Sequence, residues 1–223
     1  MGYFFYVLLL STITSVISLS VGIFSKVRSS PYSLFVLLVG FSSVGDIINV
    51  VAYAYFKLTN EYFYQLQVGY FYRILEFLIL SEFFRLLNQF PVKLTRAIQL
   101  GFVSYFLFFH PSIPYFEFEA IDSATITVLN CIIFIILVVI NLINYLKSLE
   151  VVDPLRDPKF YALASILIYF SGIIFIVLFR YIFWEMDLNA LYFTWTLQNL
   201  FLILRNLLII ITFLKMLKSN DGV

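Results

Sequence analysis

The sequence predicts an all-α, polytopic membrane protein with seven transmembrane helices, its N-terminus outside the membrane and its C-terminus in the cytoplasm. Three observations support this: the composition, a series of long apolar segments, and the uneven distribution of basic residues between the predicted loops. Of the 223 residues, 62% are hydrophobic and 12% are charged, whereas a soluble domain has about 25% charged residues. The composition excludes a soluble globule, and it excludes intrinsic disorder, which requires low hydrophobicity and high charge.

The apolar segments set the number and the bounds of the predicted helices. A helix needs about 20 predominantly apolar residues to cross a bilayer, and the fourth candidate is shorter than the others. The segments cover most of the chain, so we expect residues 1–223 to form one seven-helix domain whose cytoplasmic output passes through a partner or the helix ends. The predicted helices are 3–24, 32–56, 68–87, 95–110, 124–146, 159–183 and 190–215.

Lysine and arginine gather in the loops on one side of the predicted membrane. Because short cytoplasmic loops are rich in these residues, we assign this side to the cytoplasm. The basic side carries Lys26, Arg28, Arg85, Lys93, Arg96, Lys147, Arg156, Lys159, Lys215 and Lys218. The other side carries Lys57 and, near its edge, Arg180, together with Glu61, Glu117, Glu119, Asp122, Glu185 and Asp187.

Several functions are excluded by residues that the sequence lacks. A nucleic-acid binder has a basic footprint, but here 14 Lys and Arg balance 13 Asp and Glu. The single cysteine, Cys131, allows neither an internal disulfide nor a cysteine-based metal cluster. The single histidine, His110, belongs to no set with metal-ligand spacing, and no nucleophile–base set or phosphate loop is visible. We therefore expect no enzymatic activity, no cofactor and no metal.

The third predicted helix carries two pairs of opposite charges spaced three residues apart, Arg73 with Glu76 and Glu82 with Arg85. At about 100° per residue, the two pairs point to nearly opposite faces of the helix. We therefore expect this helix to lie centrally, with neighbours on both sides. In the alternative interpretation, each pair is a self-neutralising ion pair that only specifies packing.

The second predicted helix has one polar face, formed by Ser42, Asp46, Asn49 and Tyr53. Ionisable residues inside a membrane are costly, and they mark a functional site by default. Asp46 can contact Arg73 if the second and third helices are neighbours. The alternative is a buried ion pair that binds no ligand.

Polar residues also follow the seventh and fifth predicted helices. Arg205 lies deep in the seventh and requires a counter-ion, for which Glu82 and Glu76 lie at matching depths. Asparagine in such a stripe commonly forms hydrogen bonds between helices. The polar arc of the seventh helix comprises Thr194, Trp195, Gln198, Asn199, Arg205 and Asn206, and the stripe of the fifth comprises Thr127, Asn130, Asn141 and Asn144.

Small residues on the first and sixth predicted helices are typical of close helix packing. The outer loops at 61–67 and 111–122 are acidic and aromatic. They form either an interfacial aromatic belt or a lid over an outward-facing pocket. The small-residue faces comprise Ser11, Ser15, Ser18 and Gly22 in the first helix, and Ser165 and Gly172 in the sixth.

Three segments carry a resemblance to known sequences: PKFYALASILIYFSGIIFIVLF at 158–179, LQNLFLILRNLLIIITFL at 197–214, and YRILEFLILSEFF at 72–84. In these segments the chain resembles a group of uncharacterised bacterial seven-helix proteins of the kind common in Bacteroidetes. The group is similar to the membrane-sensor portion of bacterial signalling proteins. The resemblance implies the bacterial cytoplasmic (inner) membrane as the location, and Glu76, Arg205 and Asn206 as family positions, and it supplies no activity.

These observations favour a sensor-like or receptor-like protein that lies in the lipid bilayer, binds a small-molecule or lipid ligand and signals through a protein partner in the membrane or cytoplasm. An accessory or scaffold subunit of a membrane complex is the alternative, and a small transporter is a further one. No nucleic acid is expected as a partner. The predicted ligand-binding residues are Asp46, Asn49, Tyr53, Tyr72, Arg73, Glu76 and Gln198. The predicted buried polar network comprises Glu82, Arg85, Asn130, Asn141, Arg205 and Asn206.

Overall fold

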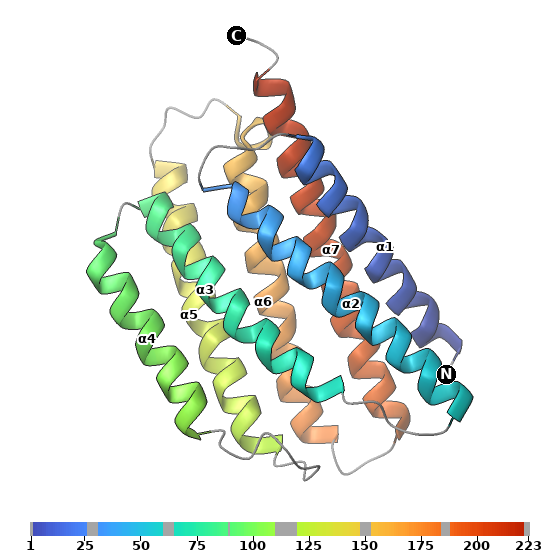
Figure 1. Ribbon diagram of the computed structural model, residues 1–223. Coiled ribbons are helices and arrows are strands. Elements are labelled where there is room, and N and C mark those ends of the chain that lie inside the picture. The colour runs from blue at the N-terminus through green and yellow to red at the C-terminus, as the bar shows by residue number, and fades with distance from the viewer. Residues whose placement is uncertain are drawn as a thin grey trace. The chain divides into compact units, whose positions relative to one another are not determined.

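The computed structural model describes residues 2–25, 31–59, 65–88, 90–109, 120–147, 153–183 and 188–220, and these residues form helices without any strand. Seven α-helices and one short 3₁₀ helix follow one another along the chain (Figure 1). The elements are α1 (Gly2–Phe24), α2 (Ser33–Thr59), α3 (Gln65–Asn88), α4 (Val92–Phe109), α5 (Ala120–Lys147), η1 (Pro154–Arg156), α6 (Pro158–Phe183) and α7 (Leu188–Asn220).

Each predicted helix is present, but several extend beyond the predicted bounds. α7 continues to Asn220, α5 begins at Ala120, and α4 begins at Val92, directly after Pro91. The prediction located apolar segments, which mark the part of a helix suited to hydrocarbon. Backbone hydrogen bonding continues into the polar residues beyond that part, so the helices are longer than their apolar stretches.

Five of the described helices are long and apolar enough to cross a membrane, namely α1, α2, α5, α6 and α7. These apolar helices suggest a membrane-embedded protein. α3 and α4 are not among the five. α3 contains four charged residues, and α4 carries Lys93 and Arg96 in its first two turns. The crossing of α3 and α4 therefore stays a prediction.

The chain divides into two compact units. The first unit combines Met1–Lys26 with Ala120–Val223, and thus contains α1, α5, η1, α6 and α7. The second unit is Val27–Glu119 and contains α2, α3 and α4. The first unit is therefore built from two stretches that are far apart in the sequence, whereas the second is continuous.

In the first unit, α7 packs on α1 on one side and on α6 on the other (Figure 1). The ring centroids of Phe4 and Trp195 lie 5.8 Å apart, and Asn206 donates a hydrogen bond to Ser15. Eleven residues separate Phe4 from Ser15, and eleven separate Trp195 from Asn206. α1 and α7 therefore run parallel and remain in step over three turns.

α6 packs on α5 in the opposite direction. The rings of Phe134 and Phe170 stack with centroids 5.0 Å apart. Near one end of the pair, the Lys159 ammonium lies 5.6 Å from the centre of the Tyr145 ring. The later residue of one helix meets the earlier residue of the other, so the two helices are antiparallel.

In the second unit, α3 lies between α2 and α4. Phe83 of α3 meets Phe35 of α2 edge to face, with centroids 4.8 Å apart. Phe77, six residues earlier on α3, stacks on Phe102 of α4 at 3.8 Å. This arrangement confirms the prediction that the third helix has a neighbour on both sides.

The small-residue faces predicted for the first and sixth helices are buried at helix contacts. Ser11, Ser15 and Ser18 of α1 are fully buried, and so is Ser165 of α6. Gly172 allows α6 and α7 to approach closely, because a β-carbon at this position would collide with the ring of Phe201. Glycine at this position is thus a packing requirement.

We expect Gly172→Ala to destabilise the protein by about 1–3 kcal/mol, because the added methyl group must displace the Phe201 ring in a packed interface. Gly101→Ala is the matched control, since a β-carbon at that position of α4 meets nothing within 4 Å. The control should leave stability unchanged or raise it by up to about 1 kcal/mol through helix propensity. Unfolding curves in a mild detergent measure both, and an equal effect of the two substitutions would contradict this packing.

Candidate functional site

The centre of the first unit holds a charged side chain. Arg205, in the middle of α7, is only 2% exposed. Its guanidinium carbon lies 4.6 Å from the centre of the Tyr169 ring of α6. A cation over an aromatic face is attracted by the ring quadrupole, by about 2 kcal/mol where water is excluded. Tyr169 therefore stabilises a charge that the surrounding apolar helices would not tolerate alone.

Asn206 joins this arginine to α1. Its Oδ1 accepts hydrogen bonds from Arg205 Nε at 3.4 Å and from Arg205 Nη2 at 3.3 Å. Its Nδ2 donates to Ser15 Oγ at 2.8 Å. Both ends of one amide are thus used, since the oxygen is directed at the cation and the nitrogen at the serine. We refer to Ser15, Tyr169, Arg205 and Asn206 as the arginine cluster.

The arginine cluster connects three helices, α1, α6 and α7, around one positive charge. Tyr169 and Asn206 are buried like Arg205, and Ser15 is fully buried. An arginine side chain keeps its charge inside proteins, so the cluster places a permanent positive charge in an apolar unit. Such a site can bind a carboxylate or another anionic group.

The second unit contains two buried carboxylates. Asp46 of α2 is buried beside Ser42 and Ser43, and Glu76 of α3 is buried as well. The hydroxyl group of Tyr72 donates to Glu76 Oε1 at 3.1 Å, one turn earlier on the same helix. The predicted ion pair between Arg73 and Glu76 is not among the contacts of the described residues. Tyr72 is therefore one partner on α3 that orients this carboxylate.

The other predicted ligand-binding residues are less buried. Asn49, Tyr53 and Arg73 are half-buried, and Gln198 of α7 is exposed. Thr194 and Arg205, which share a face of the seventh predicted helix with Gln198, are buried, and a role of Gln198 in ligand binding stays a prediction. Helical spacing fixes the direction of a side chain from the helix axis, but it does not determine whether a neighbouring helix covers that position.

Glu82 lies in a separate charge cluster between α3 and α4. Its Oε1 accepts from Arg85 Nη2 at 2.7 Å and from Arg85 Nε at 3.0 Å. Its Oε2 lies 3.5 Å from Arg96 Nη2. The predicted pair of Glu82 with Arg85 is confirmed. Glu82 and Arg205 belong to different units, so Glu82 as the counter-ion of Arg205 stays a prediction. We refer to Ser81, Glu82, Arg85, Arg96 and Gln99 as the α3–α4 charge cluster.

The asparagines of α5 do not act as the sequence suggested. Asn141 is buried, but its Nδ2 donates to the carbonyl group of Leu137 at 2.7 Å, within its own helix. Asn144 is exposed. The Oδ1 atom of Asn130 is buried and accepts no hydrogen bond from the residues that the structure describes. Among the described residues, Asn206 and Gln99 donate side-chain hydrogen bonds that join one helix to another.

Several participants were not predicted as site residues. Tyr169, Ser15, Arg96 and Gln99 became visible only when the neighbouring helices were known, although serine at the centre of a small-residue face was a signal for Ser15. Gln99 donates to Ser81 Oγ at 2.8 Å and to the Leu78 carbonyl oxygen at 3.3 Å. His110 and most of the predicted lid at 61–67 and 111–122 lie outside the described residues.

Comparisons of this chain with protein-family models, with curated proteins and with solved structures found no match. The geometry of the buried charges is therefore the basis for a functional proposal.

We expect Ser15→Ala and Asn206→Ala to be coupled in stability. Ser15→Ala should lower the free energy of unfolding by about 0.5–1.5 kcal/mol, because it removes the only partner shown for the Asn206 nitrogen. The double variant should be no less stable than Asn206→Ala alone. Ser11→Ala is the control, since Ser11 is equally buried and its hydroxyl has no hydrogen-bond partner among the described residues. Additive losses in a double-mutant cycle would contradict the contact.

Proposed function

We propose that the chain is a sensor-like or receptor-like membrane protein that crosses the membrane seven times, binds a small or lipidic ligand and signals through a partner. The burial of Asp46 and Arg205 in helices apolar enough to span a membrane, and of Glu76 in α3, carries this proposal. Ionisable groups inside a membrane domain are expensive to maintain, and their usual role is in ligand or ion recognition.

The buried carboxylates indicate the chemistry of the ligand. In the proposed site, Asp46 and Glu76 are acceptors, with Tyr72 holding Glu76 in place through the hydrogen bond of 3.1 Å. Asn49 and Tyr53 lie on the same face of α2 as Asp46, and Arg73 lies three residues before Glu76 on α3. All three are half-buried. A ligand that donates hydrogen bonds, such as one with hydroxyl or amine groups, suits these acceptors.

We also propose that α3 and α4 cross the membrane, with the N-terminus outside, in the cytoplasmic membrane of a bacterium. The charges of α3 are partly compensated, because Glu82 pairs with Arg85 and Arg96. The described basic residues at the ends of α4, η1 and α6 fall on one side of this topology, as the distribution of positive charge in membrane proteins requires.

A second candidate function, an accessory subunit of a membrane complex, is favoured by two exposed amides. Asn144 of α5 and Gln198 of α7 are exposed on helices that are long and apolar enough to span a membrane. Amide groups facing lipid have hydrogen bonds to offer to another transmembrane helix. In this alternative, the two amides contact a protein partner.

Cysteine labelling tests the seven-span topology. In intact cells we expect an impermeant maleimide to modify Asn60→Cys and Ser112→Cys, and to modify Phe90→Cys only after the membrane is permeabilised. Phe90 lies between α3 and α4, so it changes sides only if both helices cross. Leu155→Cys in η1 is the cytoplasmic control. The native Cys131 is 1% exposed and gives the unlabelled background. Labelling of all three test positions from outside would contradict the crossing of α3 and α4.

Native mass spectrometry of gently extracted protein tests ligand binding. We expect the wild-type chain to carry a small molecule or lipid of defined mass, and Glu76→Gln to lower its occupancy about tenfold or more, because a charge-assisted hydrogen bond is lost. Asp153→Asn is the matched control, since it makes the same chemical change at the N-cap of η1, where asparagine also caps well.

Two results would contradict the receptor proposal. One is equal occupancy in the wild type and in Glu76→Gln. The other is a Glu76→Gln chain that does not fold, which would give the carboxylate a structural role. A co-purifying protein that is lost on Asn144→Leu, with no bound small molecule, would favour the accessory subunit.

A further inference from the structure

α4 presents most of its surface to the outside. It packs on α3 through Gln99 and Phe102, and Thr95, one turn before Gln99 on the same side of the helix, is buried as well. Most of the other side chains that the structure describes on α4 are exposed, and the large apolar ones among them include Leu94, Ile98, Leu100 and Phe108. The first turns of the same exposed surface carry Lys93 and Arg96. One helix therefore combines a cationic beginning with an apolar continuation.

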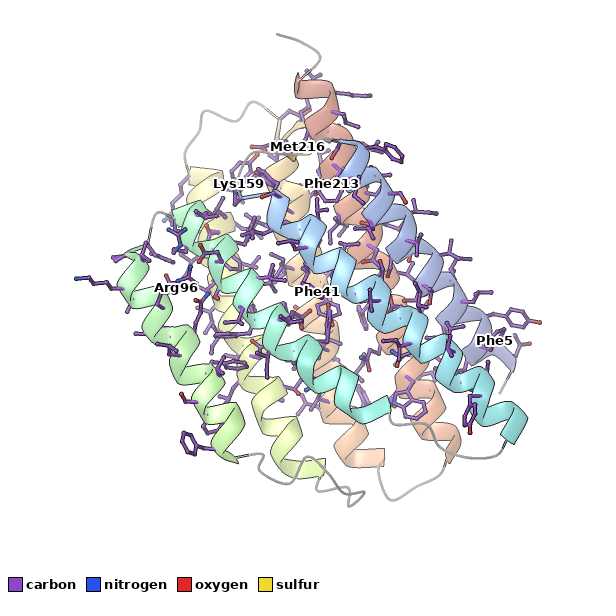
Figure 2. The ribbon with its side chains drawn as sticks, in the orientation of Figure 1. Phe5, Phe41, Arg96, Lys159, Phe213 and Met216 are labelled. Carbon is purple, nitrogen blue, oxygen red and sulfur yellow. The ribbon has the colours of Figure 1, made fainter. Side chains whose placement is uncertain are left out.

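Arg96 is held in a defined orientation at this beginning. Its Nη1 donates to Gln99 Oε1 at 2.6 Å, and its Nη2 lies 3.5 Å from Glu82 Oε2. Figure 2 shows Arg96 on α4, where that helix adjoins α3. The side chain of Arg96 is nevertheless 55% exposed. A guanidinium has five N–H donors in a rigid plane, so donors remain for a ligand outside the protein.

The charges around Arg96 do not balance. Glu82 is the one carboxylate of the α3–α4 charge cluster, and it is shared between Arg85 and Arg96. Its Oε2 atom accepts no hydrogen bond from the residues that the structure describes. Lys93, one turn before Arg96, is exposed. Two guanidinium groups thus share one carboxylate, and Lys93 adds a third positive charge one turn away on α4. Among the described residues of this region, the excess positive charge attracts an anion.

The neighbourhood of Arg96 also selects for an apolar group on that anion. Leu100 lies one turn after Arg96 on the same side of α4, and it is 67% exposed. Phe108 lies two turns beyond Leu100 and is exposed too. Lys93, Arg96 and Leu100 therefore form a line that begins with charge and continues as hydrocarbon. Phospholipids with a net negative headgroup have this same sequence of properties.

We propose that Lys93 and Arg96, with Leu100, form a binding site for an anionic phospholipid of the membrane leaflet at the start of α4. The inference rests on the proposed insertion of α4. Arginine forms paired hydrogen bonds with phosphate, and basic clusters at the cytoplasmic ends of transmembrane helices bind acidic headgroups. Gln99 and Glu82 are positioning residues, which fix the direction of the Arg96 guanidinium.

A lipid-competition experiment tests the site. The full chain is placed in mixed micelles with equal amounts of phosphatidylglycerol and phosphatidylcholine, and the two lipids have the same acyl chains. Native mass spectrometry reports the ratio of the two lipids retained. We expect Arg96→Gln and Lys93→Gln each to lower the preference for phosphatidylglycerol about fivefold. Lys147→Gln removes the same charge from an exposed residue at the end of α5 and should change the preference by less than about twofold.

Three outcomes would overturn this inference. If Lys147→Gln has the same effect as Lys93→Gln, retention follows overall charge and not a site. If millimolar inorganic phosphate displaces phosphatidylglycerol, the site takes free phosphate. If neither Arg96→Gln nor Lys93→Gln alters retention, no site exists at this position.

Two further results keep the interpretation unambiguous. Arg96→Lys is the second variant to use if Arg96→Gln does not fold. It retains the charge, so it should keep the lipid preference. The proposal would be contradicted if a folded Arg96→Lys lost the preference while Lys93→Gln left it unaltered. External labelling of Phe90→Cys identifies a failure of the proposed topology. The lipid preference of a variant is therefore interpreted only when labelling of Phe90→Cys shows that α4 crosses the membrane.

Discussion

Arg205 carries a full positive charge inside a unit of apolar helices, and the packing around it follows from the need to accommodate that charge. An isolated ion in such surroundings is strongly unfavourable. In the first unit, the Tyr169 ring of α6 and the Asn206 amide of α7 are among the groups that stabilise this charge. The Asn206 amide also donates a hydrogen bond to Ser15. The residue that stabilises the Arg205 charge on α7 therefore also fixes the position of α1.

Charge is accommodated differently at the end of the second unit. There Glu82, Arg85 and Arg96 neutralise one another in part, and the guanidinium of Arg96 remains half outside the protein. A buried charge must find all its partners within the fold, whereas a charge at the surface can leave part of its interaction capacity for another molecule. The exposure of a charged residue thus sets how much of its interaction capacity is used within the fold.

The sequence predicted the helices well, because apolar length is a property of each segment alone. The same holds for the pair of Glu82 with Arg85, whose spacing of three residues lies within one helix. Contacts between helices were not accessible in this way. Arg96 joined Glu82, and Tyr169 joined Arg205, because of which helices are neighbours. The exposure of Gln198 was inaccessible for the same reason, since spacing gives the direction of a side chain without showing what covers it.

The parallel contact of α1 with α7 has a consequence for biosynthesis. α1 is synthesised long before α7 has been translated. Until then, Ser15 and the other serines on its face contact lipids or other helices, and not Asn206 of α7. The second unit is continuous in the sequence and is complete in the nascent chain before α5 emerges. The second unit can therefore fold before the first, although the chain begins with a helix of the first unit. The packing around Arg205 is completed only when α7 is inserted.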